Sequence, residues 1–403
     1  MRVAFLQKDP MPDPGLMVLG AAVAFRGHEA EVFIPDAERD LEAALRRFAP
    51  AAVVYQPSTG FVAWFLELAR RMRIVTGGAP NVFTGSHATD HPEIALEDGV
   101  DLVMLGDPET TLPELLLKIL KERELPGTSG TAARGPDGSL LRGPERAFDE
   151  TLDQLPLPDL EIYRRYPFVL RQTTLAFASG RGVFENTHAG FRIGLDELGR
   201  RFRPARRHSV DVAIQRLNLL RQRRPIYRRV AFKDDSLVVG PREEVLAFLD
   251  RYRLEVALPF SCVAPPDLLD EALVEALAQA GCDLVRLGVE SGDAGLRSQV
   301  LGRLVEDEVV VEAAARLSRR DIEVHTINFL GLPGETMETA TATLDLNLRI
   351  RPRHAFGILV EGGAAPLRPE FERMQLLLPL AARLPALRPA VLKVVERGGD
   401  AAL

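Results

Sequence analysis

The feature that most constrains the fold is a regular alternation of strand-like and helix-like segments, which fills two separate blocks of the chain. In the first block, short β-rich runs occur at 2–7, 30–35, 51–56, 81–86 and 101–106. Segments with helical periodicity lie between and after them, at 14–27, 40–49, 61–75 and 111–122. Such alternation predicts a mostly parallel sheet with helices on both faces. We therefore predict a flavodoxin-like or Rossmann-like α/β domain over residues 1–125, with its ligand beyond the carboxyl ends of the strands.

The second block repeats the alternation with six strand–helix units. Its candidate strands are 173–179, 228–233, 257–263, 284–290, 323–330 and 354–360. The helices between them include 209–223, 241–253, 266–281 and 306–320. Six such units predict a partial (βα)6 barrel of the TIM type over residues 171–362. The site of such a barrel lies at the carboxyl ends of its strands.

Two plainer stretches separate and follow these blocks. Residues 126–170 begin with "PGTSGTAARGPDGSLLRGP", in which "PDG" is typical of a turn. Prolines in "LDQLPLPDLEIYRRYP" then oppose helix formation, so we interpret the stretch as a linker or extended strap. Residues 363–403 contain "PEFERMQLLLPLAARLPAL", which predicts an amphipathic helical tail that covers one end of the barrel.

Charge and cysteine content exclude several classes of protein. The chain has 50 basic and 57 acidic residues and a formal net charge of −7, which argues against a general nucleic-acid binder. Its apolar stretches are too short to span a bilayer, and "MRVAFLQKD" does not resemble a signal peptide. The only cysteines are Cys262 and Cys282, so we expect no disulfide framework and a cytoplasmic setting.

Polar and glycine-rich motifs follow several strands of the second block. "KDDS" contains Asp234 and Asp235, which could bind an ammonium group or act as acid and base. "VESGD" places Glu290 and Ser291 where a carboxylate could bind both hydroxyls of a ribose. Each motif also has a plain structural interpretation as a turn or a helix cap. A further motif, "GLPGET", supplies Gly331, Gly334 and Glu335; its plain interpretation is a Pro-Gly turn that ends a strand.

The first block has comparable motifs at its strand ends. The candidate binding residues are Ser58 and Thr59 in "QPSTG", Gly85, Ser86 and His87 in "GSHATDHPE", and Gly106, Asp107 and Glu109 in "GDPETT". The small residues among them could line a slot for a flat group. His87 and His91 could ligate a metal ion, but Pro92 opposes the helix that their spacing requires, so we disfavour a metal site.

The chain to about residue 360 resembles the cobalamin-dependent radical S-adenosylmethionine enzymes. The resemblance rests on "PGLMVLGAAVAFRGHEAEVFIPD", "GSHATDHPE" and "GDPETTLPELL" in the first block, and on "RRFRPARRHSVDVAIQRL", "VAFKDDSLV", "AGCDLVRLGVESGD" and "NFLGLPGET" in the second. It implies that the first domain binds cobalamin through the strand-end residues named above. It also implies an S-adenosylmethionine site in the barrel, with Glu290 and Ser291 near the ribose, Asp234 and Asp235 near the amino-acid moiety, and 331–335 near the adenine.

The chain departs from this family in the loop "ASGRGVFENTHAG" at 178–190. The family has three cysteines there, spaced Cys-x3-Cys-x2-Cys, which hold three irons of a [4Fe–4S] cluster. This chain has Val183, Thr187 and Gly190 at those positions, and none of them is a soft anionic ligand. His188 alone cannot hold a cluster, and one assembled from Cys262, Cys282 and His325 is disfavoured because they occupy different strands. We predict that no [4Fe–4S] cluster forms.

The loop after the first strand, "QKDPMPDPG", departs from another pattern that cobalamin domains use. That pattern is Asp-x-His-x-x-Gly, in which the histidine ligates cobalt. Here Asp9 is followed by Met11 at the histidine position, and Gly15 lies one place late. The radical enzymes often lack this histidine too, so cobalamin remains the expected cofactor. The lower face of the cobalt would then have a water, no ligand, or the thioether of Met11, which is a weak soft ligand.

These features lead to two hypotheses about function. The first is a cobalamin-dependent enzyme for a small-molecule substrate that uses non-radical cobalt chemistry, such as methyl transfer or Lewis-acid or nucleophile catalysis. S-adenosylmethionine would be its methyl donor or only a bound ligand. The catalytic candidates are Asp234, Asp235 and Glu290. We expect Asp235 and Glu290 to be reached by solvent and to matter little for stability. The alternative is a non-catalytic cobalamin carrier or sensor, or a subunit that supports a protein partner.

Overall fold

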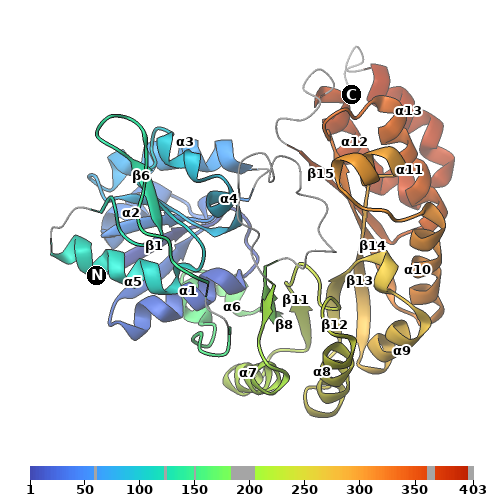
Figure 1. Ribbon diagram of the computed structural model, residues 1–403, viewed down its shortest axis with the longest axis horizontal. Helices are drawn as coiled ribbons and strands as arrows, with labels where there is room; N and C mark the ends of the chain where they lie inside the picture. Colours follow the sequence, from blue (N-terminus) through green and yellow to red (C-terminus); the bar gives the residue numbers. More distant parts are fainter. Residues whose placement is uncertain (59–60, 122–124, 149–150, 183–204, 361–367, 398–403) are drawn as a thin grey trace. The chain divides into compact units, whose positions relative to one another are not determined.

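The computed structural model describes residues 1–58, 61–121, 125–148, 151–182, 205–360 and 368–397 (Figure 1). These residues form two compact units, Met1–Gln172 and Thr173–Leu403. Both are α/β, and the predicted order of a Rossmann-like domain followed by a partial TIM-type barrel is confirmed. Among the described residues, no helix has both the length and the apolar character needed to cross a membrane.

The first unit contains a seven-stranded sheet in the order β2-β1-β3-β4-β5-β6-β7. Neighbouring strands from β2 through β5 pair parallel, whereas β6 and β7 are antiparallel additions at one edge. The strands are β1 Arg2–Leu6, β2 Glu29–Phe33, β3 Ala52–Tyr55, β4 Asn81–Phe83, β5 Leu102–Met104, β6 Thr131–Arg134 and β7 Leu140–Arg142. The last four residues of β1 and of β2 are buried, and so are all four residues of β3, as expected for a sheet covered on both faces.

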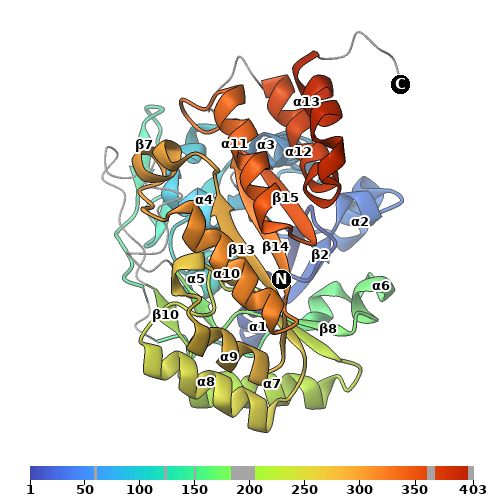
Figure 2. The same ribbon diagram turned by 90° about the vertical axis from the view of Figure 1, so that its right-hand side faces the viewer.

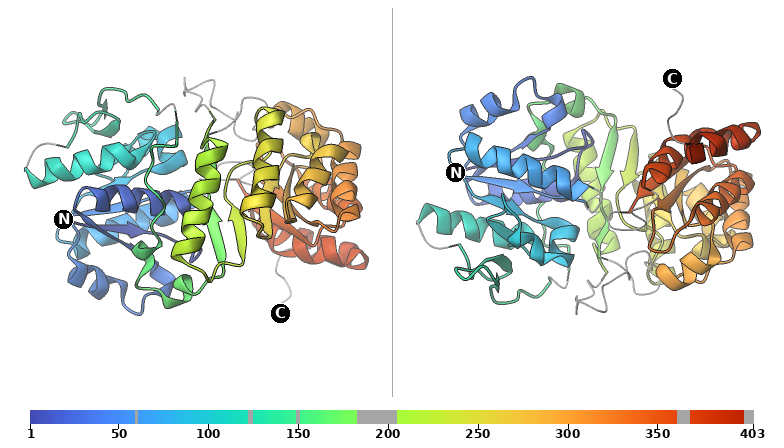
Figure 3. Two further views of the ribbon diagram at one scale, coloured as in Figure 1. Left: turned by 90° about the horizontal axis from the view of Figure 1, so that it is seen from below. Right: turned by 90° about the horizontal axis from the view of Figure 1, so that it is seen from above.

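Helices lie on both sides of this sheet (Figure 3). α1 Pro14–Phe25 and α5 Pro108–Leu120 bury their apolar residues in one core. The other core receives apolar residues from α2 Leu41–Phe48, α3 Val62–Val75, α4 Gly85–Asp90 and the 3-10 turn η3 Pro92–Leu96. A further 3-10 turn, η1 Pro35–Ala37, follows β2. The side chain of Asp13 accepts a hydrogen bond from Leu16 N and so begins α1 at the carboxyl edge of the sheet.

The stretch that the sequence predicts as a linker or strap is part of the first unit. Its glycine-rich portion forms the β6–β7 hairpin, which extends the sheet. The remainder contains η4 Leu160–Tyr163 and α6 Pro167–Leu170. Tyr163 and Tyr166 are almost completely buried in the core beside α1. The strap is therefore a structural element of this domain, and the boundary between the two units falls at residue 172.

The second unit contains six parallel strands in the order β15-β14-β13-β12-β11-β8, which is the reverse of chain order. They are β8 Thr174–Phe177, β11 Arg229–Phe232, β12 Phe260–Ala264, β13 Cys282–Glu290, β14 Glu323–Leu330 and β15 His354–Leu359. The helices between them are α7 Val210–Arg223, α8 Arg242–Glu255, α9 Glu271–Gln279, α10 Asp307–Arg319 and α11 Met337–Ile350, with shorter turns η6 Pro266–Leu268 and the π-helical η7 Leu296–Val300. Figure 2 shows these helices along one face of the strands.

The predicted C-terminal tail forms α12 Arg368–Arg383, η9 Pro385–Leu387 and α13 Arg388–Arg397. α12 packs against β15 and α11, and its Phe371, Met374 and Leu378 share a core with Leu330 and Leu344. The tail therefore continues the helical layer of the barrel beyond its sixth strand.

Candidate functional site

The loop after β1 is held by two side chains that the sequence analysis did not single out. Gln7 Nε2 donates hydrogen bonds to the carbonyl oxygens of Asp9 and of Met11, the latter at 2.6 Å. The Tyr163 hydroxyl donates to Gln7 Oε1 at 2.5 Å and accepts from Asp13 N at 2.9 Å. No local signal connects Tyr163 to this loop, because the contact spans 156 positions. The Met11 side chain is 40% exposed, so the loop presents its thioether to a ligand or to solvent.

At the ends of β3 and β4 the Gln56 side chain packs closely against Gly85 and Gly15, and we call this closely packed site the slot. Gly85 has φ +90°, and a Cβ there would lie 2.7 Å from Gln56 Cγ. A Cβ on Gly15 would lie 3.5 Å from Gln56 Nε2. The hydroxyl of Thr84 is buried and has no hydrogen-bond partner in the described part of the chain. Exposed backbone and an unsatisfied donor are the features that a flat, hydrogen-bonding ligand requires.

The remaining predicted residues of this edge are more scattered. Ser58 is exposed, and Thr59 lies outside the described residues. Ser86 and His87 lie in α4, where the ring of His87 stacks on that of His91 with centroids 4.4 Å apart. Within the described ranges, no group of three His, Cys, Asp or Glu side chains could hold a metal ion.

The turn between β5 and α5 brings the last three predicted residues of the first unit to the same edge. Gly106 has φ +75°, and its N–H donates to Thr89 Oγ1 at 3.1 Å. Asp107 is the residue before α5, and Glu109 is buried in its first turn. A carboxylate in a first turn interacts favourably with the helix dipole, so Glu109 also has a structural role.

In the barrel, Asp234 is buried at the carboxyl end of β11. Its carboxylate accepts hydrogen bonds from Ser179 N at 3.1 Å and from Ser179 Oγ at 2.6 Å. Burial raises the pKa of Asp234, while the nearby Arg207 guanidinium and the Ser179 hydrogen bonds oppose that rise. Its neighbour Asp235 is exposed. Of the two aspartates, Asp235 is thus the one that can reach a ligand directly, and Asp234 holds the end of β8.

The loop that should carry the cluster begins and ends at one short ladder. β9 Gly180–Arg181 pairs antiparallel with β10 Arg206–Arg207. Val183, Thr187 and Gly190 lie outside the described residues. Cys262 and Cys282 are buried free thiols, and the hydrogen bond between Cys262 and Cys282 together with burial raises the pKa of Cys262. A neutral buried thiol is a poor metal ligand, so the expectation that Cys262 does not join a cluster stays a prediction.

Glu290 ends β13 in a left-handed conformation with φ +67°. Its Oε1 accepts a hydrogen bond from Arg303 Nη1 at 2.9 Å, and Arg303 Nη2 donates to Asp267 at the same distance. Both Glu290 and Arg303 are 8% exposed. Ser291 is fully buried, and its hydroxyl accepts from Asp293 N at 3.1 Å. The expectation that Asp235 and Glu290 are reached by solvent is therefore wrong for Glu290, whereas Asp235 is exposed.

Glu335 closes the turn after β14. Its Oε2 accepts from Gly331 N at 2.5 Å and from Leu332 N at 2.9 Å, whereas its buried Oε1 has no hydrogen-bond partner in the described ranges. Burial raises the pKa of Glu335 to about 7, against the effect of these two N–H groups. Gly331 and Gly334 have φ +80° and +77°. Gly331 is buried and Gly334 is exposed, so the turn places exposed backbone at Gly334 beside a buried carboxyl oxygen without a partner in the described ranges.

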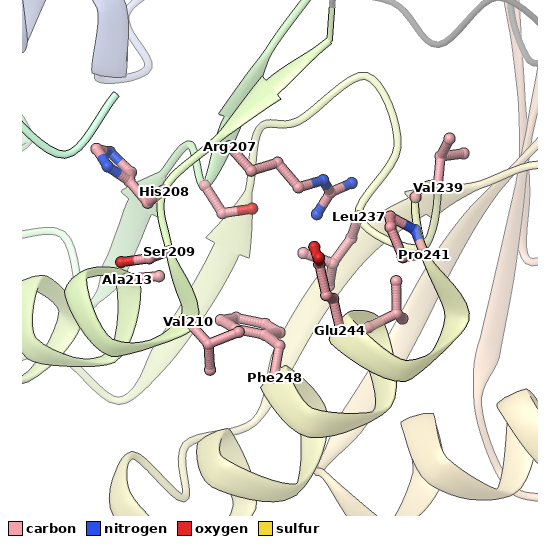
Figure 4. Close-up of a pocket in the computed structure, with 13 residues that line it drawn as sticks. Arg207, His208, Ser209, Val210, Ala213, Leu237, Val239, Pro241, Glu244 and Phe248 are labelled. Carbon is pink, nitrogen blue, oxygen red and sulfur yellow. The ribbon is translucent and has the colours of Figure 1, made fainter. Parts of the chain in front are cut away.

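A cavity of about 280 Å³ lies beside Ser179 and Arg207, between α7 and α8. Apolar side chains such as Leu237 and Phe248 line its floor. Figure 4 shows the Arg207 guanidinium and the Glu244 carboxylate pointing toward each other across it.

Comparisons with known proteins agree with the two units. The B12 binding domain family matches residues 7–116, and the radical SAM superfamily matches residues 186–346. No match was found among curated proteins.

Solved structures resemble the chain at the level of the fold. The radical S-adenosylmethionine methyltransferase TsrM from Kitasatospora setae, with tryptophan substrate and an S-adenosylmethionine analogue bound, is 18% identical with a TM-score of 0.69. The alignment covers 93% of this chain and 76% of TsrM. A second TsrM structure contains cobalamin and a [4Fe–4S] cluster. The cobalamin-dependent enzyme OxsB is 15% identical with a TM-score of 0.68, over 94% of this chain and 56% of OxsB.

Proposed function

This chain joins a B12 binding domain to a domain of the radical SAM superfamily, and from this premise we propose its function. We propose that the protein is a cobalamin-dependent methyltransferase that acts on a small molecule and works without an iron–sulfur cluster. S-adenosylmethionine is its methyl donor. The methyl group leaves the sulfonium as a cation equivalent, so the transfer moves an electron pair and needs no external reductant for each turnover.

The first unit fits cobalamin. The buried, unsatisfied hydroxyl of Thr84 and the glycine cradle at Gly85 and Gly15 supply the backbone access and the hydrogen-bond donor that its nucleotide tail needs. Gln56 lines the same slot, and Met11 faces outward from the loop after β1. Bound cobalamin supplies a cobalt centre that can accept a methyl group and pass it on.

The barrel mouth fits S-adenosylmethionine. Backbone at Gly334 is exposed to an adenine, which carries both donors and acceptors, and the neighbouring Glu335 has a buried Oε1 without a hydrogen-bond partner in the described ranges. Glu290 is oriented by Arg303, and a carboxylate held in this way can accept hydrogen bonds from ribose hydroxyls. The exposed Asp235 is the residue that can attract the positively charged ammonium or sulfonium group.

The donor set at the cluster positions does not fit a [4Fe–4S] cluster, and this observation carries the proposal. Val183 and Gly190 have no donor atom in their side chains, and Thr187 offers only a hydroxyl. Reductive cleavage of the sulfonium needs a cluster with an open iron, so a chain that lacks the ligands keeps only two-electron chemistry. That TsrM is a methyltransferase of similar fold supports methyl transfer as the reaction.

The experiment supplies the protein with cobalamin, a chemical reductant to prepare the cobalt, and S-adenosylmethionine carrying a deuterated methyl group, in the absence of iron. We expect the labelled methyl group to appear on cobalamin, detected by mass spectrometry and by the change in visible spectrum. Label transfer only after iron and sulfide are added would overturn the cluster-free mechanism. Tight cobalamin binding with no label transfer under either condition would instead support the carrier hypothesis.

A further inference from the structure

Three basic side chains form a row across neighbouring strands of the barrel sheet. Arg286 on β13 is in register with His325 on β14, and His325 is in register with His354 on β15. Their neighbours Val285, Val324 and Ala355 are buried. Because successive side chains of a strand point to opposite faces, the three basic groups lie together on the face away from the helices. We call Arg286, His325 and His354 the basic row.

The guanidinium of Arg286 has no hydrogen bond and no ion pair in the described part of the chain, although Arg286 is partly buried. Burial lowers its pKa, and Arg229 lowers it further. Other buried arginines of this unit are paired, as Arg303 is with Glu290 and Arg297 is with Asp307. Arg286, by contrast, keeps its guanidinium nitrogens accessible and has no counter-charge among the described residues, so a ligand can supply the negative charge.

The two histidines leave donor atoms for the same ligand. The rings of His325 and His354 have centroids 5.9 Å apart. Nε2 of His325 contacts Glu323 Oε1 at 2.7 Å, whereas its buried Nδ1 has no partner in the described ranges. Either ring nitrogen can donate a hydrogen bond when it carries a proton. The row thus combines one fixed positive charge with two imidazoles.

An apolar surface continues from the basic row along β15. Phe356 and Ile358 occupy the same face as His354 and are 38% and 42% exposed. The centroid of the Phe356 ring lies 4.2 Å from that of His354. Large exposed apolar side chains on the strand that carries one end of the basic row are suited to a ligand with a charged end and an apolar or aromatic body.

We propose that the barrel binds an organic anion, whose carboxylate or phosphate group contacts the basic row and whose apolar body lies on Phe356 and Ile358. His354 begins β15 and His325 is the third residue of β14, so this site lies toward the amino ends of these strands and is separate from the site proposed at their carboxyl ends. The binding does not rest on the proposed function, because these residues belong to the barrel alone. Arg286 is the residue that selects for charge, since a bidentate guanidinium is the strongest side-chain partner of either anion.

The test measures binding of four probes to the full chain without cobalamin by calorimetry: benzoate, its neutral analogue benzamide, phenyl phosphate and inorganic phosphate. We expect benzoate or phenyl phosphate to bind, and benzamide to bind at least tenfold more weakly than benzoate. The tighter of the two organic anions identifies the anionic group. Equal binding of benzoate and benzamide, or no binding of either organic anion, would overturn the proposal.

Arg286→Met tests the assignment of the residue. It keeps much of the side-chain volume and should weaken anion binding roughly tenfold to a hundredfold without lowering the melting temperature, because Arg286 has no protein partner to lose. Arg242→Met is the matched control, because Arg242 is paired with Asp270 at 2.7 Å and is not among the charges that act on Arg286. It should leave anion binding unchanged. Unchanged binding in Arg286→Met, or an equal loss in both variants, would refute the role of the row. Anion binding to a protein that fails to bind cobalamin would separate this proposal from the proposed function.

Discussion

The two ligand-binding edges of this chain are constructed in opposite ways. In the first unit, the slot at Gly85 consists of backbone, small residues and one buried hydroxyl, that of Thr84, with no partner in the described residues. In the barrel, the predicted carboxylates are already engaged: Asp234 by Ser179, and Glu290 by Arg303. The first edge has glycine backbone covered by Gln56 and a buried hydroxyl without a partner in the described residues, whereas the second has charges that are buried and oriented.

This difference predicts different consequences of substitution. A slot formed by glycine backbone contributes little to the folded state until the ligand enters, so changes there should affect affinity first. A buried carboxylate that is paired with an arginine or with backbone N–H groups contributes to the folded state itself, so changes there should affect stability as well. Four experiments separate these cases.

The largest expected effect is a change in iron and sulfide binding, which depends on the residues at 183, 187 and 190. We expect the wild-type chain to bind no stoichiometric iron and sulfide after anaerobic reconstitution, because 183, 187 and 190 carry no thiolate. The combined change Val183→Cys, Thr187→Cys and Gly190→Cys should allow about four irons per chain, as in other clusters of this type. Iron and sulfide analysis with the visible spectrum measures both. A cluster in the wild-type protein would contradict the proposal.

The next effect tests the slot. Gly85→Phe should weaken cobalamin binding roughly a thousandfold, because its Cβ would meet Gln56 Cγ at 2.7 Å and its φ of +90° strains a side chain. Gly78→Phe is the control, because Gly78 has φ +93° with nothing within 4 Å of a Cβ. It adds the same strain in open space and should bind cobalamin as the wild type does. Equal affinities in both variants, measured by spectroscopic titration, would place the tail elsewhere.

A third effect is the pH dependence from Glu335, whose pKa burial raises from its ordinary value of 4.5 to about 7. Below pH 4.5 the carboxyl is protonated in both the folded and the unfolded chain. Between pH 4.5 and pH 7 the unfolded chain has lost this proton while the folded chain keeps it, so the free energy of unfolding should fall by up to about 3 kcal/mol as the pH rises through this range. Denaturant titrations at pH 5 and pH 8 measure the change. Glu335→Gln should flatten the profile, and the same slope in that variant would assign it to another group.

The smallest effect compares two carboxylates of the barrel mouth. Glu290→Gln should lower the free energy of unfolding by about 2 kcal/mol, because it weakens a buried ion pair while Arg303 keeps Asp267. Asp235→Asn removes an exposed charge and should change stability by less than about 0.5 kcal/mol. Both should weaken binding of S-adenosylmethionine. If Glu290→Gln is as stable as the wild type, the Glu290–Arg303 ion pair does not stabilise the fold, and in this respect the barrel mouth does not differ from the slot.

Much of the fold follows from local patterns in the sequence. Alternating apolar runs and helical periodicity predicted both sheets, and parallel order then placed the motifs of 85–87, 234–235 and 331–335 at carboxyl edges. The strap at 152–167 was predicted only as an extended connection. Its role in the core was missed because Tyr163 and Tyr166 bind partners more than a hundred positions away, Gln7 and Ile34.

The sequence by itself determined the two α/β units, the positions of the glycines and the absence of thiolates at 183, 187 and 190, because these properties depend on residue type and near neighbours. Only the tertiary structure decided which carboxylates are locked and which are available. Arg303 reaches Glu290 through the turn after β13, and Arg286, His325 and His354 meet because three strands pair in one register. Pairing of charges depends on distance in space and on burial, and neither is encoded in the identity of a single residue.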